Sequence, residues 1–213
     1  MFFAYLVTAL IGYFLGNFNG ALLTSRILFH EDIRKKGSGN AGLTNFYRVY
    51  GGWATFCVIV IDAGKALLSV LFGGLVFSAF GLPVITGRYF AALCVVTGHI
   101  FPVFYGFKGG KGILSAGAAM WLLDWRVAAV AFGLFFAAML LTRFVSLGSI
   151  LGVISFPLTT CIFHVHSAEI VALLLCSVLT AALALWSHRG NMDRLMDGKE
   201  RKFHFHRWKN TES

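Results

Sequence analysis

The chain has 213 residues, of which 58% are hydrophobic and only 13% are charged, and its mean hydropathy is +0.77. Because soluble domains carry about a quarter charged residues, this composition excludes a soluble globular protein and indicates an integral membrane protein. The net charge of +9 does not indicate nucleic-acid binding, because the basic residues gather in short segments between apolar runs, as they do in cytoplasmic loops.

Apolar segments that can form bilayer-crossing helices follow one another along the whole chain, and each such helix needs about 20 residues. The candidates are Phe3–Leu28, Trp53–Phe80, Arg88–Gly98, Gly112–Leu123, Val127–Thr142, Ser146–Phe163 and Ala168–Ser187. The third must extend toward Pro83, and the fourth must borrow residues from the glycine-rich loop before it. We therefore predict an all-α integral membrane protein with about seven transmembrane helices.

The lysines and arginines predict the orientation of these helices. With the N-terminus outside and seven crossings, only Arg88 and Arg126 lie at outer ends, and all the others lie at or near the inner face. If Gly112–Leu123 were re-entrant, the basic tail would emerge outside, so the charge rule favours seven crossings. We expect one polytopic membrane domain over residues 1–213, with cytoplasmic loops at about 29–52 and 99–111 and a basic cytoplasmic tail over 188–213.

The first predicted loop holds glycines among cations, in the stretch RKKGSGNAGLTNFYR over residues 34–48. Glycines let backbone N–H groups approach a ligand closely, and neighbouring cations supply the charge that a phosphate needs. GSGNAG formally matches a dinucleotide fingerprint, but that fingerprint needs a preceding strand and a βαβ unit. The candidate binding residues of this loop are Ser38, Asn40, Thr44, Asn45 and Arg48.

The second predicted loop, GHIFPVFYGFKGGKG over residues 98–112, places Lys108 and Lys111 around Gly109 and Gly110. Close helix packing explains glycines but not flanking lysines, so we interpret this loop as a second place for a phosphate. It is not a Walker A loop, because Gly112 stands where that loop needs Ser or Thr to hold magnesium. Since no carboxylate cluster accompanies either loop, we expect no metal and no cofactor.

Further polar residues reach the same predicted face of the membrane. Ser146 lies at the inner end of the sixth span, and His188 follows the last span. Asn191 and Arg194 lie three and six residues after His188, which suits one face of a helix. This mixture of donors fits a ligand that carries an anion and a hydroxyl group.

Two charged residues lie inside the second span. Asp62 and Lys65 are about one helical turn apart, and intramembrane charges are usually paired or functional. We interpret them as a structural or orienting ion pair rather than a catalytic one. His99, at the end of the third span, fits a satisfied helix-end histidine as readily as a ligand-binding group.

Together these motifs resemble the acyl-phosphate:glycerol-3-phosphate acyltransferases of bacterial membranes, the PlsY family. GSGNAGLTNFYR over 37–48 is similar to the pattern G-S-G-N-x-G-A-T-N-x-x-R, and HRGNMDRLMDGKE over 188–200 is similar to H-x-x-N-x-x-R-L-x-x-G-x-E. The glycine-rich loop lies between them, and the resemblance spans nearly the whole chain. Leu43 replaces a usual alanine, and NFNG at 17–20 replaces a Ser-Ile-Pro-like helix break. Neither departure removes a cation or a hydroxyl group from the site.

The resemblance implies transfer of a fatty acyl group from acyl phosphate to the sn-1 hydroxyl of glycerol 3-phosphate, which gives lysophosphatidic acid and phosphate. It also implies the first step of phospholipid synthesis, a bacterial inner membrane, contact with membrane lipid, and a site that faces the cytoplasm. A site within one chain needs no partner, so we expect a monomer. The implied catalytic residues are His188, Lys111, Ser38 and Asn191, and the implied binding residues are Arg48, Ser146, Asn40, Thr44, Asn45, Lys108, Gly109 and Gly110. The general base is open between His188 and the phosphate of the donor.

Two rival interpretations remain. HRGNMD contains His188 and Asp193 in the spacing H-x-x-x-x-D, the dyad of acyl-CoA-dependent glycerolipid acyltransferases, although those enzymes keep it in a soluble α/β domain. Glycines near charges also suit an anion or phosphate transporter, but transporters place their site near the bilayer midplane, usually between repeats. Here the charges collect at one face, and the sequence has no convincing internal repeat.

Overall fold

The computed structural model describes residues 1–203, and within that range all regular structure is helical. The first half contains α1 (Phe2–Asn17), α2 (Gly20–Phe29), η1 (Ile33–Lys35), α3 (Leu43–Tyr50), α4 (Ala54–Ala79), α5 (Val84–Ile100) and η2 (Val103–Tyr105). The second half contains α6 (Ile113–Leu123), α7 (Trp125–Thr142), α8 (Val145–His164), α9 (Ile170–Ser187) and α10 (Arg189–Met196). The predicted all-α fold is confirmed; the last ten residues of the predicted tail, 204–213, lie outside the described residues.

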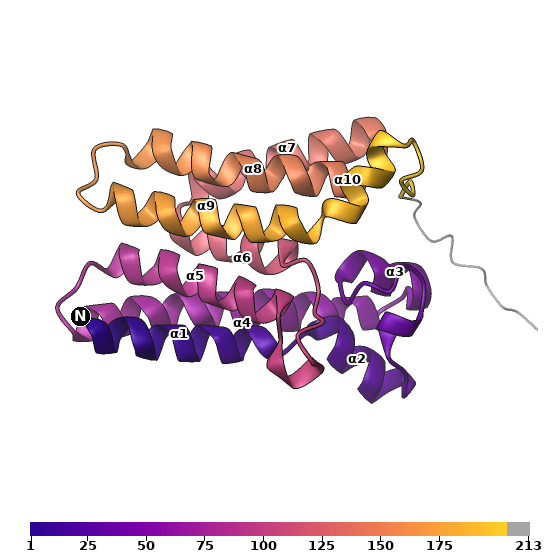
Figure 1. Cartoon of the computed structure of the whole chain (residues 1–213), viewed down its shortest axis with the longest axis horizontal. Coiled ribbons are helices and arrows are strands. Elements are labelled where there is room, and N and C mark those ends of the chain that lie inside the picture. The colour runs from indigo at the N-terminus through magenta and orange to yellow at the C-terminus, as the bar shows by residue number, and fades with distance from the viewer. Residues whose placement is uncertain (204–213) are drawn as a thin grey trace, which may run out of the picture.

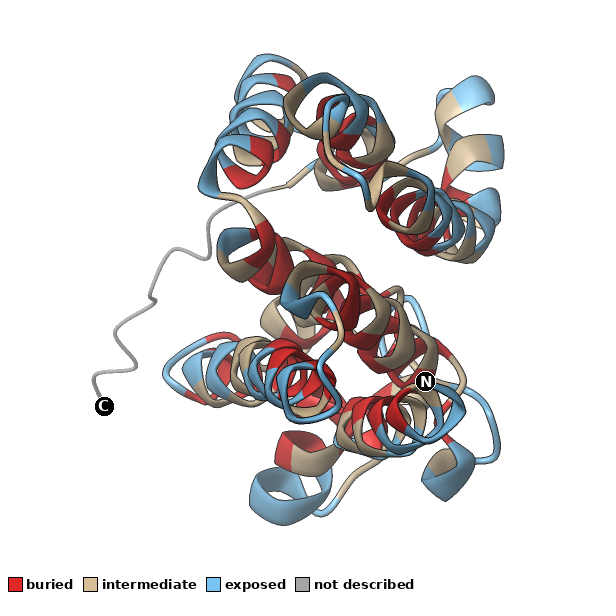
Figure 2. Cartoon of the chain, turned by 90° about the vertical axis from the view of Figure 1, so that its left-hand side faces the viewer, coloured by how far each residue is buried: buried red, intermediate tan, exposed pale blue. Residues whose placement is uncertain are grey.

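The long helices run side by side in one bundle (Figure 1). One group is formed by α1, α4 and α5 and another by α7, α8 and α9, while α6 lies between them and α5 contacts α9. Viewed end-on, buried residues face neighbouring helices and exposed ones lie on the outside (Figure 2). Many of the exposed side chains are large and apolar: Leu141 is 85% exposed and Leu140 is 70% exposed. Such a surface is stable against lipid tails rather than water.

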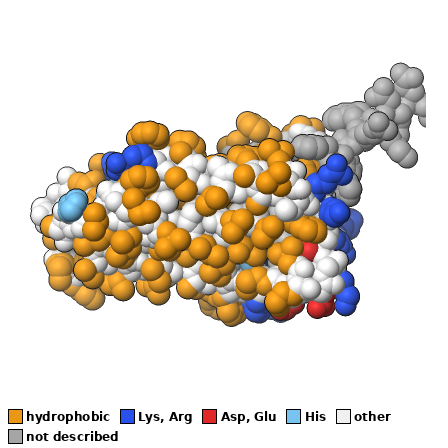
Figure 3. All heavy atoms as spheres, turned by 90° about the horizontal axis from the view of Figure 1, so that it is seen from above, with side chains coloured by type: hydrophobic (Ala, Val, Ile, Leu, Met, Phe, Trp, Pro, Cys, Tyr) orange, Lys and Arg blue, Asp and Glu red, His pale blue; other side chains and the backbone are white. Residues whose placement is uncertain are grey.

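Charge is concentrated at one end of this bundle. Hydrophobic side chains cover its long side, and Lys and Arg side chains gather chiefly at the end that carries α3 and α10 (Figure 3). The N-terminus lies at the opposite end (Figure 1). Within residues 1–203, six helical stretches are long and apolar enough to cross a membrane. The count of seven crossings and the orientation of the termini stay predictions.

The predicted fourth span is the exception in length. Helix α6 has 11 residues and is about 16 Å long at 1.5 Å per residue, which is shorter than a bilayer core. A non-helical stretch from Phe107 to Lys111 leads into it from the charged end (Figure 1). At its other end Asp124 Oδ2 lies 3.1 Å from His164 Nε2, where α8 also ends. The chain thus enters the bundle partly as non-helical backbone of the glycine-rich loop.

The predicted first span is broken between α1 and α2. Asn19 accepts a hydrogen bond from Leu22 N at 2.9 Å and thereby caps the start of α2. Just before the break, α1 crosses α5 closely: a Cβ on Gly16 would lie 2.3 Å from Val95 O, and one on Gly98 would lie 2.1 Å from Tyr13 O. Only glycine allows this approach of two helices. The break and the crossing bring the ends of α1 and α5 together beneath the charged surface.

Candidate active site

Asn45 organises the first glycine-rich loop. Its Oδ1 accepts a hydrogen bond from Ser38 N at 2.7 Å, and its Nδ2 donates to Lys36 O at 3.1 Å and to Asn40 O at 3.0 Å. Gly37 adopts a φ of +61°, and a Cβ there would lie 2.3 Å from Asn45 Oδ1. The glycine therefore makes room for the amide that folds the loop. The result presents Ser38 and Asn40 beside the start of α3.

The second glycine-rich loop folds back on the end of α5. Gly109 N donates to Ile100 O and Gly110 N donates to His99 O, each at 3.1 Å. A Cβ on Gly109 would lie 2.0 Å from His99 O, and one on Gly110 would lie 2.3 Å from His99 Nε2. These two glycines are therefore required by packing, and their N–H groups are already used inside the protein. The fold of the loop places Lys111, the residue directly after Gly110, at the candidate site.

A cavity of about 1180 Å³ opens at the charged end and reaches between α6, α7 and α8. Its polar part is lined by predicted site residues: Ser38, Asn40, Thr44, Asn45, Arg48, Lys111, Ser146, His188 and Asn191. Its inner part is lined mainly by apolar residues: Leu114, Gly117, Met120, Ala131, Phe132, Phe135, Phe136 and Val153. One space thus combines a cationic polar end with an apolar extension, which suits an amphiphilic ligand with an anionic head.

Glu200 lies at the centre of the polar part. Its Oε1 accepts hydrogen bonds from Ser146 Oγ at 2.9 Å and from Asn191 Nδ2 at 2.7 Å, and its Oε2 accepts one from Arg194 Nε at 2.8 Å. Lys111 Nζ donates to Asn191 Oδ1. This network joins the start of α8, α10 and the glycine-rich loop around one carboxylate.

Burial changes the protonation of Lys111. It lowers the pKa of the ammonium to about 8, and the positive charges of Arg194 and Arg48 act in the same direction, while Glu200 opposes them. Lys111 is therefore largely charged at neutral pH but loses its proton on mild alkalinisation. Arg48, which donates to Arg201 O at 3.2 Å, also has its pKa lowered by burial and still keeps its charge, because a guanidinium titrates far above pH 7.

His188 is held in one tautomer. Its Nδ1 lies 2.8 Å from Ala184 O, and a carbonyl oxygen only accepts, so Nδ1 carries the ring proton and Nε2 is left as an acceptor. Burial and then the charge of Lys111 lower its pKa to about 4, so the imidazole is neutral at physiological pH. A neutral imidazole with an available Nε2 can accept a hydrogen bond from a ligand hydroxyl.

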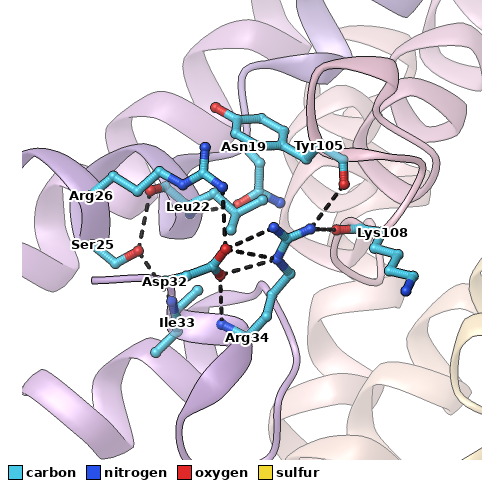
Figure 4. A network of polar contacts seen from close by, with 9 residues as sticks. All are labelled: Asn19, Leu22, Ser25, Arg26, Asp32, Ile33, Arg34, Tyr105 and Lys108. Carbon is cyan, nitrogen blue, oxygen red and sulfur yellow. Dashed lines mark hydrogen bonds and ion pairs between the residues drawn. The ribbon is translucent and has the colours of Figure 1, made fainter. Parts of the chain in front are cut away.

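Three predicted site residues lie outside the lining of this cavity. Lys108 and Gly109 line a second hollow with Arg34, Lys35, Asp32 and Tyr105, and Gly110 packs on His99. Around this second hollow, Arg34 donates to Lys108 O at 3.1 Å, and the Lys108 amine points away from the guanidinium (Figure 4). The structure therefore brings Lys111 together with the rest of the candidate site but sets Lys108 apart from it.

Several cavity residues were not among the predicted site residues. Arg194 follows His188 at helical spacing and Glu200 ends the third motif, and both line the cavity. A carboxylate is not an obvious component of an anion site. Asp62 and His99 also line the cavity, although the sequence places Asp62 inside the second span and His99 directly after the third. Helical spacing could have found Arg194; the other three depend on contacts between distant segments.

A family model described as glycerol-3-phosphate acyltransferase matches residues 6–198. A glycerol-3-phosphate acyltransferase from Clostridioides difficile is 33% identical over 200 residues, covering 94% of this chain and 96% of the relative. One from Parasynechococcus marenigrum is 38% identical over 193 residues, covering 90% and 86%. All predicted site residues lie inside the matched range, whereas Glu200 lies just beyond the end of the family model.

Two solved structures are similar to this fold over nearly its whole length. Both are crystal structures of PlsY, an integral membrane glycerol 3-phosphate acyltransferase. The glycerol 3-phosphate form gives a TM-score of 0.81 at 32% identity, covering 94% of this chain and 96% of that one. The lysophosphatidic acid form gives 0.78 at 31% identity, covering 94% and 95%.

Proposed function

The chain belongs to the glycerol-3-phosphate acyltransferase family, and we propose that its acyl donor is an acyl phosphate and its acceptor the sn-1 hydroxyl of glycerol 3-phosphate. It is thus a multi-pass membrane acyltransferase of phospholipid synthesis, and the products of the proposed reaction are lysophosphatidic acid and phosphate. The observation that carries the proposal is the single cavity with a cationic end and an apolar extension.

The size and lining of the cavity support two substrates at once. Its volume of about 1180 Å³ exceeds the roughly 300–1,000 Å³ of pockets for single small ligands. Phosphate groups of donor and acceptor would occupy the polar end, and the acyl chain would lie along Met120, Phe132 and Phe135. Apolar burial of the chain would stabilise the complex by about 0.8 kcal/mol per CH₂ group.

Different residues of the polar end bind the two substrates. In this proposal Ser38, Asn40 and Thr44 hold the head group of the acyl phosphate. Glycerol 3-phosphate lies against Arg48 and Lys111, whose charges favour its phosphate, and against a set of neutral donors and acceptors formed by Ser146, His188 and Asn191. A charge-assisted hydrogen bond contributes about 1.5–3 kcal/mol, so each cation is worth roughly ten- to a hundredfold in binding.

The reaction needs no covalent enzyme intermediate, because acyl phosphate already carries a good leaving group. The sn-1 oxygen attacks the acyl carbon, the bond from that carbon to the phosphate oxygen breaks, and the hydroxyl proton is transferred to a base. The low pKa of His188 makes it a weak base, whereas the departing phosphate titrates near pH 6. We therefore favour the donor phosphate as the final proton acceptor, with His188 Nε2 orienting the hydroxyl. Lys111 would stabilise the charge of the leaving phosphate.

The concentration of Lys and Arg at the end that carries the cavity supports a site on the cytoplasmic side of a bacterial inner membrane (Figure 3). Reconstituting the protein in vesicles and testing which side of the membrane accepts glycerol 3-phosphate would check this orientation. The predicted topology would be supported if turnover occurred only with glycerol 3-phosphate on the side of the membrane where added protease cleaves the C-terminal tail.

The test of the reaction uses purified protein in lipid with glycerol 3-phosphate and either palmitoyl phosphate or palmitoyl-CoA. Phosphate release and lysophosphatidic acid are measured, and the position of the acyl chain is determined. We expect 1-acyl product from palmitoyl phosphate alone. Product from palmitoyl-CoA alone, lost in Asp193→Ala, would replace this proposal with the H-x-x-x-x-D chemistry. Substrate flux in sealed vesicles without product would replace it with transport.

A further inference from the structure

Three titratable residues have no part in the proposed reaction: Asp62 and His99 line the cavity, and Lys65 contacts both of them. Asp62, Lys65 and His99 are buried, with 1%, 5% and 3% of their surfaces exposed. We infer that they form a positioning site that holds the glycine-rich loop, residues 108–112, and thereby fixes Lys111 in the cavity. This inference rests on the proposed role of Lys111 in binding phosphate.

Lys65 joins α4 to the break between α1 and α2. Its Nζ donates to Phe18 O at 2.9 Å and to Gly16 O at 3.2 Å, which are carbonyl groups that the end of α1 leaves without helical partners. It also donates to Asp62 Oδ1 at 2.7 Å, and that oxygen accepts a hydrogen bond from Gly20 N at 3.0 Å. The ion pair therefore fastens both sides of the break to α4.

His99 extends this connection to the glycine-rich loop. Lys65 Nζ lies 2.7 Å from His99 Nδ1, and Asp62 Oδ1 lies 3.5 Å from the same nitrogen, so the ring of His99 contacts both members of the ion pair. The ring packs so closely on Gly110 that a Cβ there would lie 2.3 Å from Nε2. The carbonyl of His99 accepts Gly110 N at 3.1 Å, so ring and main chain of His99 hold the residue before Lys111.

A second connection holds the residues after Lys111. Ser115 Oγ, in the first turn of α6, donates to the carbonyl oxygen of Asp62 at 3.1 Å. Lys111 thus lies between two anchors: Gly110 packs on His99, which contacts the ion pair, and Ser115 is bonded to the main-chain carbonyl of Asp62. Buried charges would not be needed if these residues only held α1 against α4, because apolar side chains of similar volume stabilise such a contact as well.

The test begins with His99→Leu, which removes the ring nitrogen that contacts Lys65 and the ring that packs on Gly110. We expect kcat/KM for glycerol 3-phosphate to fall about ten- to a hundredfold, because small displacements of a binding group have effects of that size. His99→Asn, whose amide can still form a hydrogen bond with the ion pair, should recover part of the loss. Ser69→Ala is the matched control, because Ser69 is a buried α4 residue that donates to Ala91 O at 3.1 Å, away from the loop.

A readout of Lys111 itself separates positioning from stability. The rate at which an amine-selective reagent labels Lys111 is measured against pH by peptide mass spectrometry. In His99→Leu the loop should loosen, so the limiting rate of labelling at high pH should rise and the midpoint should move to higher pH, toward that of an exposed lysine. This measurement needs no turnover, so it tests the inference even if the enzyme uses another acyl donor.

The double variant Asp62→Asn/Lys65→Met guards against a simple folding failure, because it removes both charges and leaves neither unpaired. It should match His99→Leu in kcat/KM and in Lys111 labelling while eluting like the wild type in detergent. Unchanged labelling in both variants would overturn the inference. So would a loss of activity that equals the loss of folded protein, as measured by chromatography.

Discussion

Arg34 and Lys111 are cations at the same end of the bundle, yet their surroundings are opposite. The Arg34 guanidinium contacts both oxygens of Asp32, at 3.0 Å for Oδ1 and 2.7 Å for Oδ2, and donates to Tyr105 O at 2.9 Å (Figure 4). Its hydrogen bonds raise its own pKa and lower that of Asp32. Lys111 donates to the neutral amide of Asn191, and burial lowers its pKa.

The difference separates cations that join segments from cations that are kept for a substrate. Arg34 has a carboxylate and two carbonyl groups of its own chain, so little of its charge remains for a ligand, and it holds the first loop to residues 105–108. Lys111 is desolvated in a cavity without such complete compensation, which is the environment in which a substrate phosphate gains most. The role of a cation in a glycine-rich motif therefore follows from the groups that it contacts and not from the motif.

The largest effect should come from Lys111→Met, with Lys108→Met as its matched control three residues away. We expect Lys111→Met to lower kcat/KM at least a hundredfold, because it removes a buried charge that is proposed both to bind a substrate phosphate and to stabilise the leaving phosphate. Lys108 lies outside the cavity lining, so Lys108→Met should lower kcat/KM by no more than about threefold, through its effect on the surface potential. Steady-state acyl transfer in lipid measures both. Equal losses of kcat/KM in the two variants would contradict the separate roles of Lys111 and Lys108.

The next comparison is Arg48→Gln against Arg34→Gln. Arg48 lines the cavity, so its loss should raise KM for glycerol 3-phosphate about ten- to a hundredfold with an unchanged Tm. Arg34→Gln should instead lower Tm by roughly 2–4 °C while KM stays the same, because it breaks a join between segments. A raised KM in Arg34→Gln would assign the second hollow to substrate binding.

The pH dependence should report Lys111. Its pKa of about 8 means that the charged form is present below that pH and is lost above it, so kcat/KM should fall above pH 8, by at most tenfold per pH unit. His188, with a pKa of about 4, stays neutral throughout this range. Lys111→Arg should remove the alkaline limb, because a guanidinium keeps its charge. An alkaline limb that survives this substitution would belong to another group.

The smallest effect should come from Glu200→Gln. The amide can still accept from Ser146 or Asn191, so kcat at pH 7 should change by no more than about fivefold. Glu200 raises the pKa of Lys111, so removing its charge should move the alkaline limb to lower pH. Asp197→Asn, an exposed carboxylate of the same segment, is the control that should leave the limb in place.

The sequence alone determined the class of the molecule. Hydropathy is a local property, so the apolar runs predicted helices in the right places, and the comparisons with known proteins confirm the predicted family. The three motifs also contained most of the residues that line the polar end of the cavity. Residue types at fixed spacing carry this information because the chemistry of binding a phosphate needs cations, hydroxyl groups and amides.

Only the tertiary structure decided which of these residues share a site and what each contacts. Gly109 and Gly110 are glycines because the His99 carbonyl and ring lie against them, a contact that no local pattern contains. Asn45 folds its own loop, Lys108 lines a separate hollow, and Glu200 joins α8 to α10. The physical reason is the same in each case: composition sets which interactions are available, while packing between distant segments sets their direction and leaves Lys111, rather than Lys108, facing the cavity.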